Sequence, residues 1–480
     1  MTVIPLADSF APASRADWLA LVEKTLKGAG VETLITRAGA LEIEPLYEPA
    51  DATQRARFAS SPRGGDPAWD IRAAIRQPGP AAAQEALLEE LAGGAASVLI
   101  SIDPTGAAGV AVGSAERLAE VLDGVLTDVA PVALDARFLG PHAADWLSTA
   151  VKASPTAPLA LHLDPLSAFA QAGSSPGPIE SHLIAAAGVA ARLAPTHPRA
   201  TLFLASGQLV HEAGGEPADE LAFALAAALA YAKALVRAGV ALEISFGAVV
   251  LGLAVDADPL ISIAKLRAAR MAWTRLAGAC GVTRGATIEV RSSRRMLTRA
   301  DAWTNLVRLT SAAFAGAVGG ADAIVIGAFT DALGLPTAFA RRMSRNLQLI
   351  LMEEGHVGAV ADPAAGAGAL ETLGADLARA AWAGFNAIEA AGGVVAALRE
   401  GVIAQRVKAA TADLAAGLAD RSLRVVGVTD FRAGEAPAPT TALAEAVPVA
   451  APDPRLPGPD SHCPALTPIR LEDLAPGGLA

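Results

Sequence analysis

Eight short apolar runs, separated by helical patterns, constrain this sequence more than any other feature. Between residues 69 and 329 they are WDIRAAI, SVLISID, PVALDA, LALHLD, TLFLASG, ISFGAVVLG, TIEVRSS and AIVIGAF. Most are continuously apolar, as expected for strands of a parallel sheet covered on both faces. The alternation with helical patterns predicts a (β/α)8 barrel. An open doubly wound sheet is the alternative, although no GxGxxG or Walker motif follows any run.

Composition limits the class of protein. The chain has 480 residues, is 52% hydrophobic and carries a formal net charge of −11 with interspersed signs. It can bury a large core, and its charge argues against nucleic acid or a membrane as a partner. Cys280 and Cys463 lie far apart, which predicts neither a disulfide framework nor a cysteine metal site. With no secretion signal and no apolar span, we expect a cytoplasmic protein.

The flanks of the barrel region differ from it in pattern. Ser14 and Asp17 have capping-box spacing before a helix whose apolar side carries Trp18 and Val22. Residues 331 to 422 are nearly continuous helix with breaks at Pro336, Asp362-Pro363 and Gly392-Gly393, and a Pro- and Ala-rich stretch follows. The expected organisation is an N-terminal arm with a subunit-contact helix (1–60), the barrel (61–340), a helical extension (341–432) and a linker or tail (433–480).

The histidines are the first candidates for chemistry. None of the seven has HExxH or i,i+4 spacing, so no metal site is predicted. His211 follows the run TLFLASG, and with Glu212 beside it could form a base and its orienting carboxylate. From the local sequence alone, a solvated loop residue is the favoured interpretation of His211.

The stretch SSRRMLTR offers a cluster of cations. Arg294, Arg295 and Arg299 could hold a phosphate near a barrel rim. Ion pairs at a domain or subunit boundary are the commoner use of such clusters. The carboxylates considered available for these pairs are those of Asp301, Glu353 and Glu354.

The sequence PDSHCPALT contains Asp460-x-His462, which has the spacing by which some cobalamin domains present a cobalt-ligating imidazole. That motif continues DxHxxG, but its sixth position here is Ala465, and only fifteen residues follow it. We therefore interpret it as a chance match in a linker and expect no cobalamin-binding domain.

Several long stretches resemble the methylmalonyl-CoA mutase family, over roughly residues 14 to 430. WLALVEKTLKGAGVETL with LEIEPLYEPAD is similar to its N-terminal arm, and DPLISIAKLRAARMAW to its IAKxRAAR helix. DALGLPTAFARRMSRNLQLILMEE resembles DEALGLPTxFSxRIARNTQLILQEE, and ADPAAGAGALETL occupies the place of its DPxGGSYYxE element. The resemblance implies a barrel that holds a coenzyme A thioester, with adenosylcobalamin supplying the radical that interconverts succinyl-CoA and methylmalonyl-CoA.

The family's catalytic side chains do not carry over. Against SGYHMQEAG this chain has SGQLVHEAG, so Gln208 stands at the tyrosine position and Leu209 at the catalytic histidine position, with His211 two residues further on. Against PWTVRQYAG it has AWDIRAAIR, which puts Ala74 at the radical-shielding tyrosine. Against SLHTN it has AIVIG, with Val325 at the histidine. These four residues predict a vestigial pocket with no catalytic, cofactor-binding or metal-binding residue.

SSRRMLTR also resembles the small, non-catalytic subunit of the heterodimeric bacterial mutase. The resemblance implies a pseudoenzyme chain that binds neither cofactor nor CoA ester and pairs with a large catalytic subunit carrying adenosylcobalamin. We further expect Leu209 and its neighbours partly to plug the pocket. The alternatives are the barrel chain of an active acyl-CoA mutase with a separate cobalamin-binding polypeptide, and a free-standing pseudoenzyme scaffold.

Overall fold

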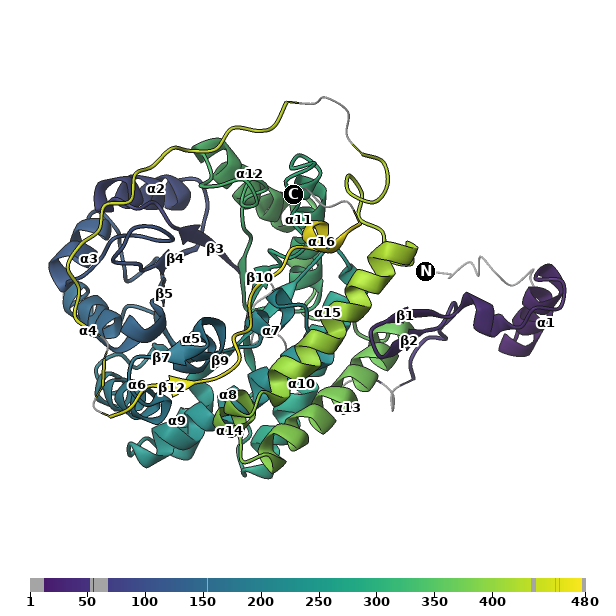
Figure 1. Cartoon of the computed structure of the whole chain (residues 1–480), viewed down its shortest axis with the longest axis horizontal. Helices are drawn as coiled ribbons and strands as arrows, with labels where there is room; N and C mark the ends of the chain where they lie inside the picture. Colours follow the sequence, from purple (N-terminus) through teal and green to yellow (C-terminus); the bar gives the residue numbers. More distant parts are fainter. Residues whose placement is uncertain are drawn as a thin grey trace, which may run out of the picture.

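Eight parallel strands form a closed barrel in the order β10-β11-β3-β4-β5-β6-β8-β9 (Figure 1). The computed structural model describes residues 13–51, 55, 68–152, 154–432, 437–453, 455–456 and 458–476. The barrel strands are β3 (Asp70–Ile75), β4 (Ser97–Ser101), β5 (Val132–Asp135), β6 (Leu159–Leu163), β8 (Thr201–Ser206), β9 (Val249–Val255), β10 (Thr287–Ser292) and β11 (Ala323–Val325). Each predicted apolar run overlaps one of them. The (β/α)8 prediction is confirmed, and the doubly wound alternative is wrong.

One predicted strand begins later than its apolar run. In ISFGAVVLG the first four residues end helix α9 (Leu242–Gly247), and β9 starts only at Val249. A short apolar run does not distinguish a buried helical turn from a strand, so the sequence pattern merged the two elements.

Helices surround the barrel and bury their apolar sides against the strands. They are α2 (Pro80–Ala92), α3 (Ala115–Val121), α4 (Gly140–Ala150), α5 (Pro165–Ala172), α6 (Ile179–Leu193), α8 (Pro217–Arg237), α10 (Pro259–Ala279), α11 (Asn305–Val318) and α12 (Ala338–Leu349). The start of α10 shows the local cause. Pro259 supplies a preset φ, and the Asp258 side chain accepts a hydrogen bond from the backbone N–H of Ile261. Within the described residues, no helix combines the length and apolarity needed to cross a membrane.

The barrel closes where β11 pairs with β3, and polar side chains tie the last helix to the first. Glu90 on α2 accepts hydrogen bonds from Arg345 Nη1 at 2.5 Å and from Arg341 Nε at 3.2 Å, both on α12. Trp69, just before β3, donates its indole N–H to Gln348 Oε1 at 3.2 Å. The Glu90 carboxylate is buried, so its charge is stabilised by the two guanidinium groups rather than by water.

The helical extension adds an outer layer. It comprises a π-helical turn η4 (Ile350–Glu354), η5 (Val357–Ala359), α13 (Gly368–Ala390), α14 (Val394–Arg399) and α15 (Val402–Asp420). Helix α13 packs against both α8 and α10. The predicted break at Gly392-Gly393 is confirmed: both residues have φ above +90°, which glycine adopts without a steric penalty.

The N-terminal arm lies largely outside the barrel. It contains α1 (Arg15–Thr25), η1 (Val31–Leu34) and a hairpin of β1 (Thr36–Ala38) and β2 (Leu41–Ile43). The predicted capping box is present at Ser14 and Asp17. Figure 1 shows α1 projecting away from the body, and none of its residues is buried. The barrel therefore leaves the apolar side of this helix uncovered.

Residues 437–453, 455–456 and 458–476, here called the strap, follow the rim formed by the segments after the barrel strands (Figure 1). Strap N–H groups donate to backbone carbonyls in the segments after β11, β4 and β8, in the pairs Ala442–Leu335, Val449–Pro104 and Ile469–Glu212, each at 2.8 Å. A short strand β12 (Ser461–His462) pairs with β7 (Ser174–Ser175). A Cβ on Gly113 would lie 2.0 Å from the carbonyl oxygen of Ala450, so the close approach requires glycine there. Backbone hydrogen bonds therefore hold the strap against the barrel, although its sequence has no helical or strand periodicity.

The closing seam yields a stability prediction. Glu90→Gln should lower the free energy of unfolding by about 3–5 kcal/mol, because it removes the carboxylate paired with the buried guanidinium of Arg345 and one of the two carboxylates paired with Arg341. Glu89→Gln is the matched control: Glu89 also pairs with Arg341 but is largely exposed, so the loss should stay below about 1 kcal/mol. Urea denaturation measures both variants. Equal losses would contradict the role assigned to the seam.

Candidate functional site inside the barrel

An ion pair crosses the interior of the barrel. Arg291 Nη1 on β10 lies 3.1 Å from Asp135 Oδ2 on β5. In the closed ring these two strands are four places apart among eight, so they stand opposite each other. Side chains from opposite strands meet only by passing through the barrel axis. The lumen is therefore filled at this level.

Further charged groups extend the network. Arg72 on β3 contacts Glu289 Oε2 at 2.5 Å, Asp70 Oδ2 at 2.7 Å and the Ser97 hydroxyl at 2.9 Å. Glu289 Oε1 also accepts from Arg291 Nε at 2.9 Å. Burial opposes the charge of Glu289, but attraction to nearby positive groups lowers the pKa of that carboxyl far below its ordinary value. Each buried carboxylate thus has a guanidinium partner, the condition for burying charge at tolerable cost.

His162 enters the same network from β6. Its φ is +46°, at an irregularity in register between Ala160 and Leu163, and its Nε2 lies 3.5 Å from Glu289 Oε2. Neither ring nitrogen has a hydrogen-bond partner among the described residues. Burial, the largest cause, lowers the pKa of His162 to about 4. At neutral pH the His162 imidazole is uncharged, so Arg72 and Arg291 supply the positive charges that face the carboxylates of the network.

Two of the predicted vestigial residues lie together. Ala74 and Val325 belong to a small apolar cluster with Leu99, Ala133 and Ala160, contributed by five consecutive strands of the ring. None of these side chains can donate or accept a hydrogen bond or a proton. These side chains therefore cannot act as general acids or bases.

Gln208 and Leu209 lie elsewhere, on the short helix α7 (Gln208–Glu212) that follows β8. Leu209 packs against the main core, outside the Ala74 and Val325 cluster. Gln208 Nε2 donates to Glu212 Oε1 at 3.3 Å. Gln208 and Leu209 are therefore not members of the apolar cluster that contains Ala74 and Val325. That Leu209 plugs a former pocket stays a prediction.

His211 is buried, so the interpretation of a solvated loop residue is wrong. Its Nε2 lies 2.8 Å from the Ser293 hydroxyl, and its Nδ1 is 3.8 Å from Glu220 Oε2. Glu220 in turn pairs with Lys265 Nζ at 2.5 Å. Burial, reinforced by Arg295 and Lys265, lowers the pKa of His211 well below its ordinary value. The order Ser-His-Glu is that of a nucleophile and its base, but all three side chains are sealed from solvent, which leaves a structural role.

Two of the three predicted arginines form ion pairs, as the commoner interpretation held, but with other carboxylates than those expected: Arg295 lies 3.8 Å from Asp256, and no ion pair of Arg294 is found within the described residues. Arg299 contacts Glu472 at 2.8 Å and also Asp473, both on helix α16 (Leu471–Leu474) of the strap. Asp301 accepts instead from the Thr304 hydroxyl at 2.5 Å. A carboxylate more than 170 residues away in sequence leaves no local pattern by which to find it.

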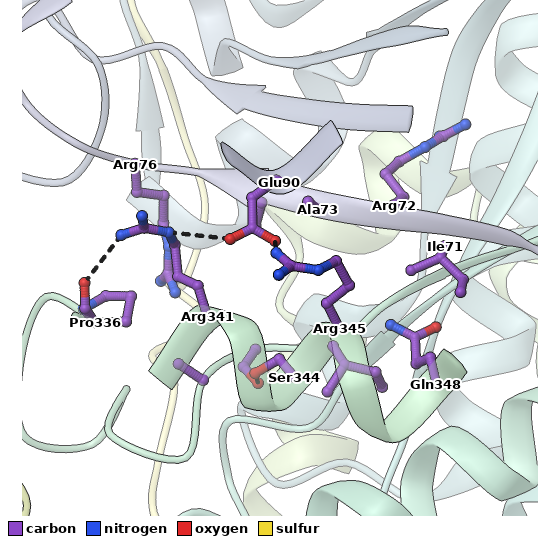
Figure 2. A pocket seen from close by; sticks show the side chains of 14 residues that line it. Ile71, Arg72, Ala73, Arg76, Glu90, Pro336, Arg341, Ser344, Arg345 and Gln348 are labelled. Carbon is purple, nitrogen blue, oxygen red and sulfur yellow. Dashed lines mark hydrogen bonds and ion pairs between the residues drawn. The ribbon is translucent and has the colours of Figure 1, made fainter. Parts of the chain in front are cut away.

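A cavity of about 30 Å³ lies at the closing seam, and Figure 2 shows Glu90 between Arg341 and Arg345 on its wall. It has room for on the order of two water molecules, far too little for an acyl-CoA. In the described part of the chain, no three His, Cys, Asp or Glu side chains are grouped so that they could hold a metal ion.

The residues of the Asp460-x-His462 motif do not fit cobalamin. Asp460 accepts a hydrogen bond from the backbone N–H of Gly177 at 3.0 Å. His462 belongs to the strap strand β12, pairs with Ser174 of β7 and is exposed to solvent. The His462 imidazole therefore lies on a two-residue surface strand, and among the described residues it is not part of a buried site. The interpretation as a chance match agrees with this placement.

These features define a (β/α)8-barrel protein whose lumen holds ionic and small apolar side chains in place of an open channel. Comparison with known proteins identifies its lineage. Residues 98–449 match the family description "Methylmalonyl-CoA mutase". The chain is 37% identical to the methylmalonyl-CoA mutase small subunit of Streptomyces virginiae, over 90% of this chain and 73% of that protein.

Other relatives agree. Identity is 33% to the small subunit of Propionibacterium freudenreichii subsp. shermanii, over 90% of this chain and 70% of that protein. It is 28% to the methylmalonyl-CoA mutase of Cereibacter sphaeroides, over 86% and 64% respectively. The chain belongs to the methylmalonyl-CoA mutase family, which depends on adenosylcobalamin.

The lumen network predicts a pH effect on stability. His162 has a folded pKa of about 4 and an unfolded value of about 6.5, so between them only the unfolded chain binds the proton. His162 therefore makes stability fall as pH falls from 6.5 to 4, by at most about 1.4 kcal/mol per pH unit. His162→Gln should remove this share of the slope. Ile184→Gln, on the surface, should retain it, and an unchanged slope in the His162 variant would refute the assignment.

Proposed function

We propose that this chain is the small, non-catalytic subunit of a heterodimeric methylmalonyl-CoA mutase, and that the interconversion of succinyl-CoA and methylmalonyl-CoA takes place on a large partner chain. The observation that carries the proposal is the ion pair between Arg291 and Asp135 across the lumen. The names of the small-subunit relatives support it.

The lumen network opposes substrate binding. In the family the barrel holds the coenzyme A thioester, so a bound substrate would have to separate Arg291 from Asp135 and Arg72 from Glu289. Arg72 and Glu289 are both buried, and removing the partner of a buried charge costs about 3–5 kcal/mol, which is comparable to the whole binding energy of a millimolar ligand. The Asp135 side chain is 42% exposed, so separating it from Arg291 costs less. We infer that the chain takes up no CoA ester.

The replaced side chains oppose catalysis independently. Ala74, Leu209 and Val325 supply no hydrogen-bond donor where the family has phenol or imidazole groups. Loss of one preorganised donor typically costs a factor of about 10²–10³ in rate. We infer that the chain has no active site of its own, binds no cofactor, and relies on adenosylcobalamin held by the partner.

The N-terminal arm is proposed as one contact with that partner. Helix α1 has 11 residues and buries none of them. Isolated helices of this length are marginal in water, so α1 needs a covering surface. We assign residues 1–60 to the arm, 61–340 to the barrel, 341–432 to the helical extension and 433–480 to the linker or tail that forms the strap, and place the assembly in the cytoplasm.

The first test is direct. The purified chain, mixed with adenosylcobalamin and isotopically labelled succinyl-CoA, should form no labelled methylmalonyl-CoA, and calorimetric titration with succinyl-CoA should give no saturable heat. The large catalytic chain under the same conditions is the positive control. Turnover or saturable uptake by this chain alone would overturn the proposal.

The second test concerns the arm. Co-expressed with the large subunit, the chain should elute with it in size-exclusion chromatography. Trp18→Glu should weaken the complex by at least about tenfold, because it places a charge on the apolar side of α1. Glu23→Gln, which changes the other side of the same helix, should leave elution unchanged. Separate elution of the wild-type chains would count against the heterodimer.

A further inference from the structure

Two neighbouring outer helices each present an exposed apolar stripe. On α11 and the residues just before it, Trp303, Val307 and Phe314 are exposed, and Val307 and Phe314 follow Trp303 by 4 and 11 residues. Along α12 and its continuation η4, Phe339 and Ile350 are exposed, also 11 residues apart. Eleven residues are close to three helical turns, so each set lies on one side of its helix. The two helices contact each other and lie side by side in Figure 1.

Every exposed Phe, Tyr or Trp of the described residues belongs to this region. They are Trp303, Phe314, Phe339 and Phe431. The buried Phe329 joins two of them, stacking on Trp303 at 5.1 Å and meeting Phe339 edge-on at 6.3 Å between ring centroids.

The segment carrying Phe431 is fixed beside α11. Arg308 on α11 donates to the carbonyl oxygen of Val426 at 2.5 Å. Val426 is itself exposed, five residues before Phe431. We call the surface formed by seven residues the aromatic face: Trp303, Val307, Phe314, Phe339, Ile350, Val426 and Phe431.

Unpaired arginines accompany the aromatic face. Arg342, Arg424 and Arg432 are exposed, and none forms an ion pair within the residues that the structure describes. Arg342 lies over the Phe339 ring, 5.6 Å from its centroid. The chain as a whole carries a net charge of −11, yet these three exposed guanidinium groups lie near its exposed aromatics. The Arg432 guanidinium also donates to the Val428 carbonyl at 2.9 Å, and the exposed carboxylates of Glu353 and Glu354 lie on η4 with Ile350. Aromatic residues and arginine are the types enriched at the energetic centres of protein interfaces.

We propose that the aromatic face binds the large catalytic chain, through a partner surface with an apolar centre and carboxylates opposite Arg342, Arg424 and Arg432. The inference rests on the proposed function and adds to it a second contact, separate from the arm. Charge complementarity selects the acidic border, because free guanidinium groups attract carboxylates and repel a basic surface. The curated relatives named small subunits make a different, larger chain the occupant in preference to a second copy.

The test compares equally exposed apolar positions on and off the aromatic face. Val307→Glu and Phe431→Glu change side chains that are 70% and 82% exposed. Val129→Glu and Ile184→Glu, at 76% and 73%, are the matched controls elsewhere on the chain. Affinity for the co-purified large subunit is measured by surface plasmon resonance, and the melting temperature of each free variant checks its fold.

The first two variants should bind the large subunit at least about tenfold more weakly, with unchanged melting temperatures, while the controls stay within about twofold of the wild type. Wild-type affinity in both aromatic-face variants would overturn the inference while leaving the heterodimer intact. No binding by the wild-type chain would instead overturn the proposed function. If the free chain dimerises and Val307→Glu makes it monomeric, the occupant is a second copy and the inference is wrong.

Discussion

The contact between Arg291 and Asp135 determines what the rest of the barrel can be. A guanidinium and a carboxylate reaching across the axis from opposite strands convert a channel into a core. Once charges are buried there, each needs a partner, and Arg72, Glu289 and Asp70 supply them. The His162 imidazole is neutral near pH 7, because burial lowers its pKa to about 4. The small apolar cluster around Ala74 and Val325 occupies the remaining interior positions of the neighbouring strands. The charged side chains at this level of the barrel are therefore paired with one another.

The closing seam of the barrel and the strap along its rim are held by different kinds of interaction. The seam between α2 and α12 relies on one buried carboxylate shared by two arginines, where geometry is tight and water is excluded. The strap relies on backbone hydrogen bonds to one rim loop after another, which need no side-chain pattern. The strap contacts segments that follow the barrel strands, where barrels of this kind carry catalysis, so these segments are stabilised by backbone hydrogen bonds.

Function in this chain is proposed to lie on its surface. The lumen and α7 retain polar groups, but their hydrogen bonds and ion pairs are internal, as the burial of His211 and Ser293 shows. Outside, by contrast, α1 and the aromatic face remain uncovered. Apolar side chains left in water are unfavourable unless another surface removes them from it, and contiguous exposed patches of this kind usually mark interaction sites. A subunit that supports a catalytic partner needs such surfaces more than it needs a pocket.

The sequence alone determined the eight strands, the capping box at Ser14, the helix break at Gly392-Gly393 and the family, because periodicity, capping and long motifs are encoded by residues close together in the chain. That the family's catalytic side chains are replaced stays a prediction from the sequence. Only the tertiary structure decided what fills the barrel and where His211 and Arg299 find their partners. The Arg291–Asp135 and Arg72–Glu289 contacts join residues 156 and 217 positions apart, so no local pattern records them. They exist because ring closure brings distant strands face to face.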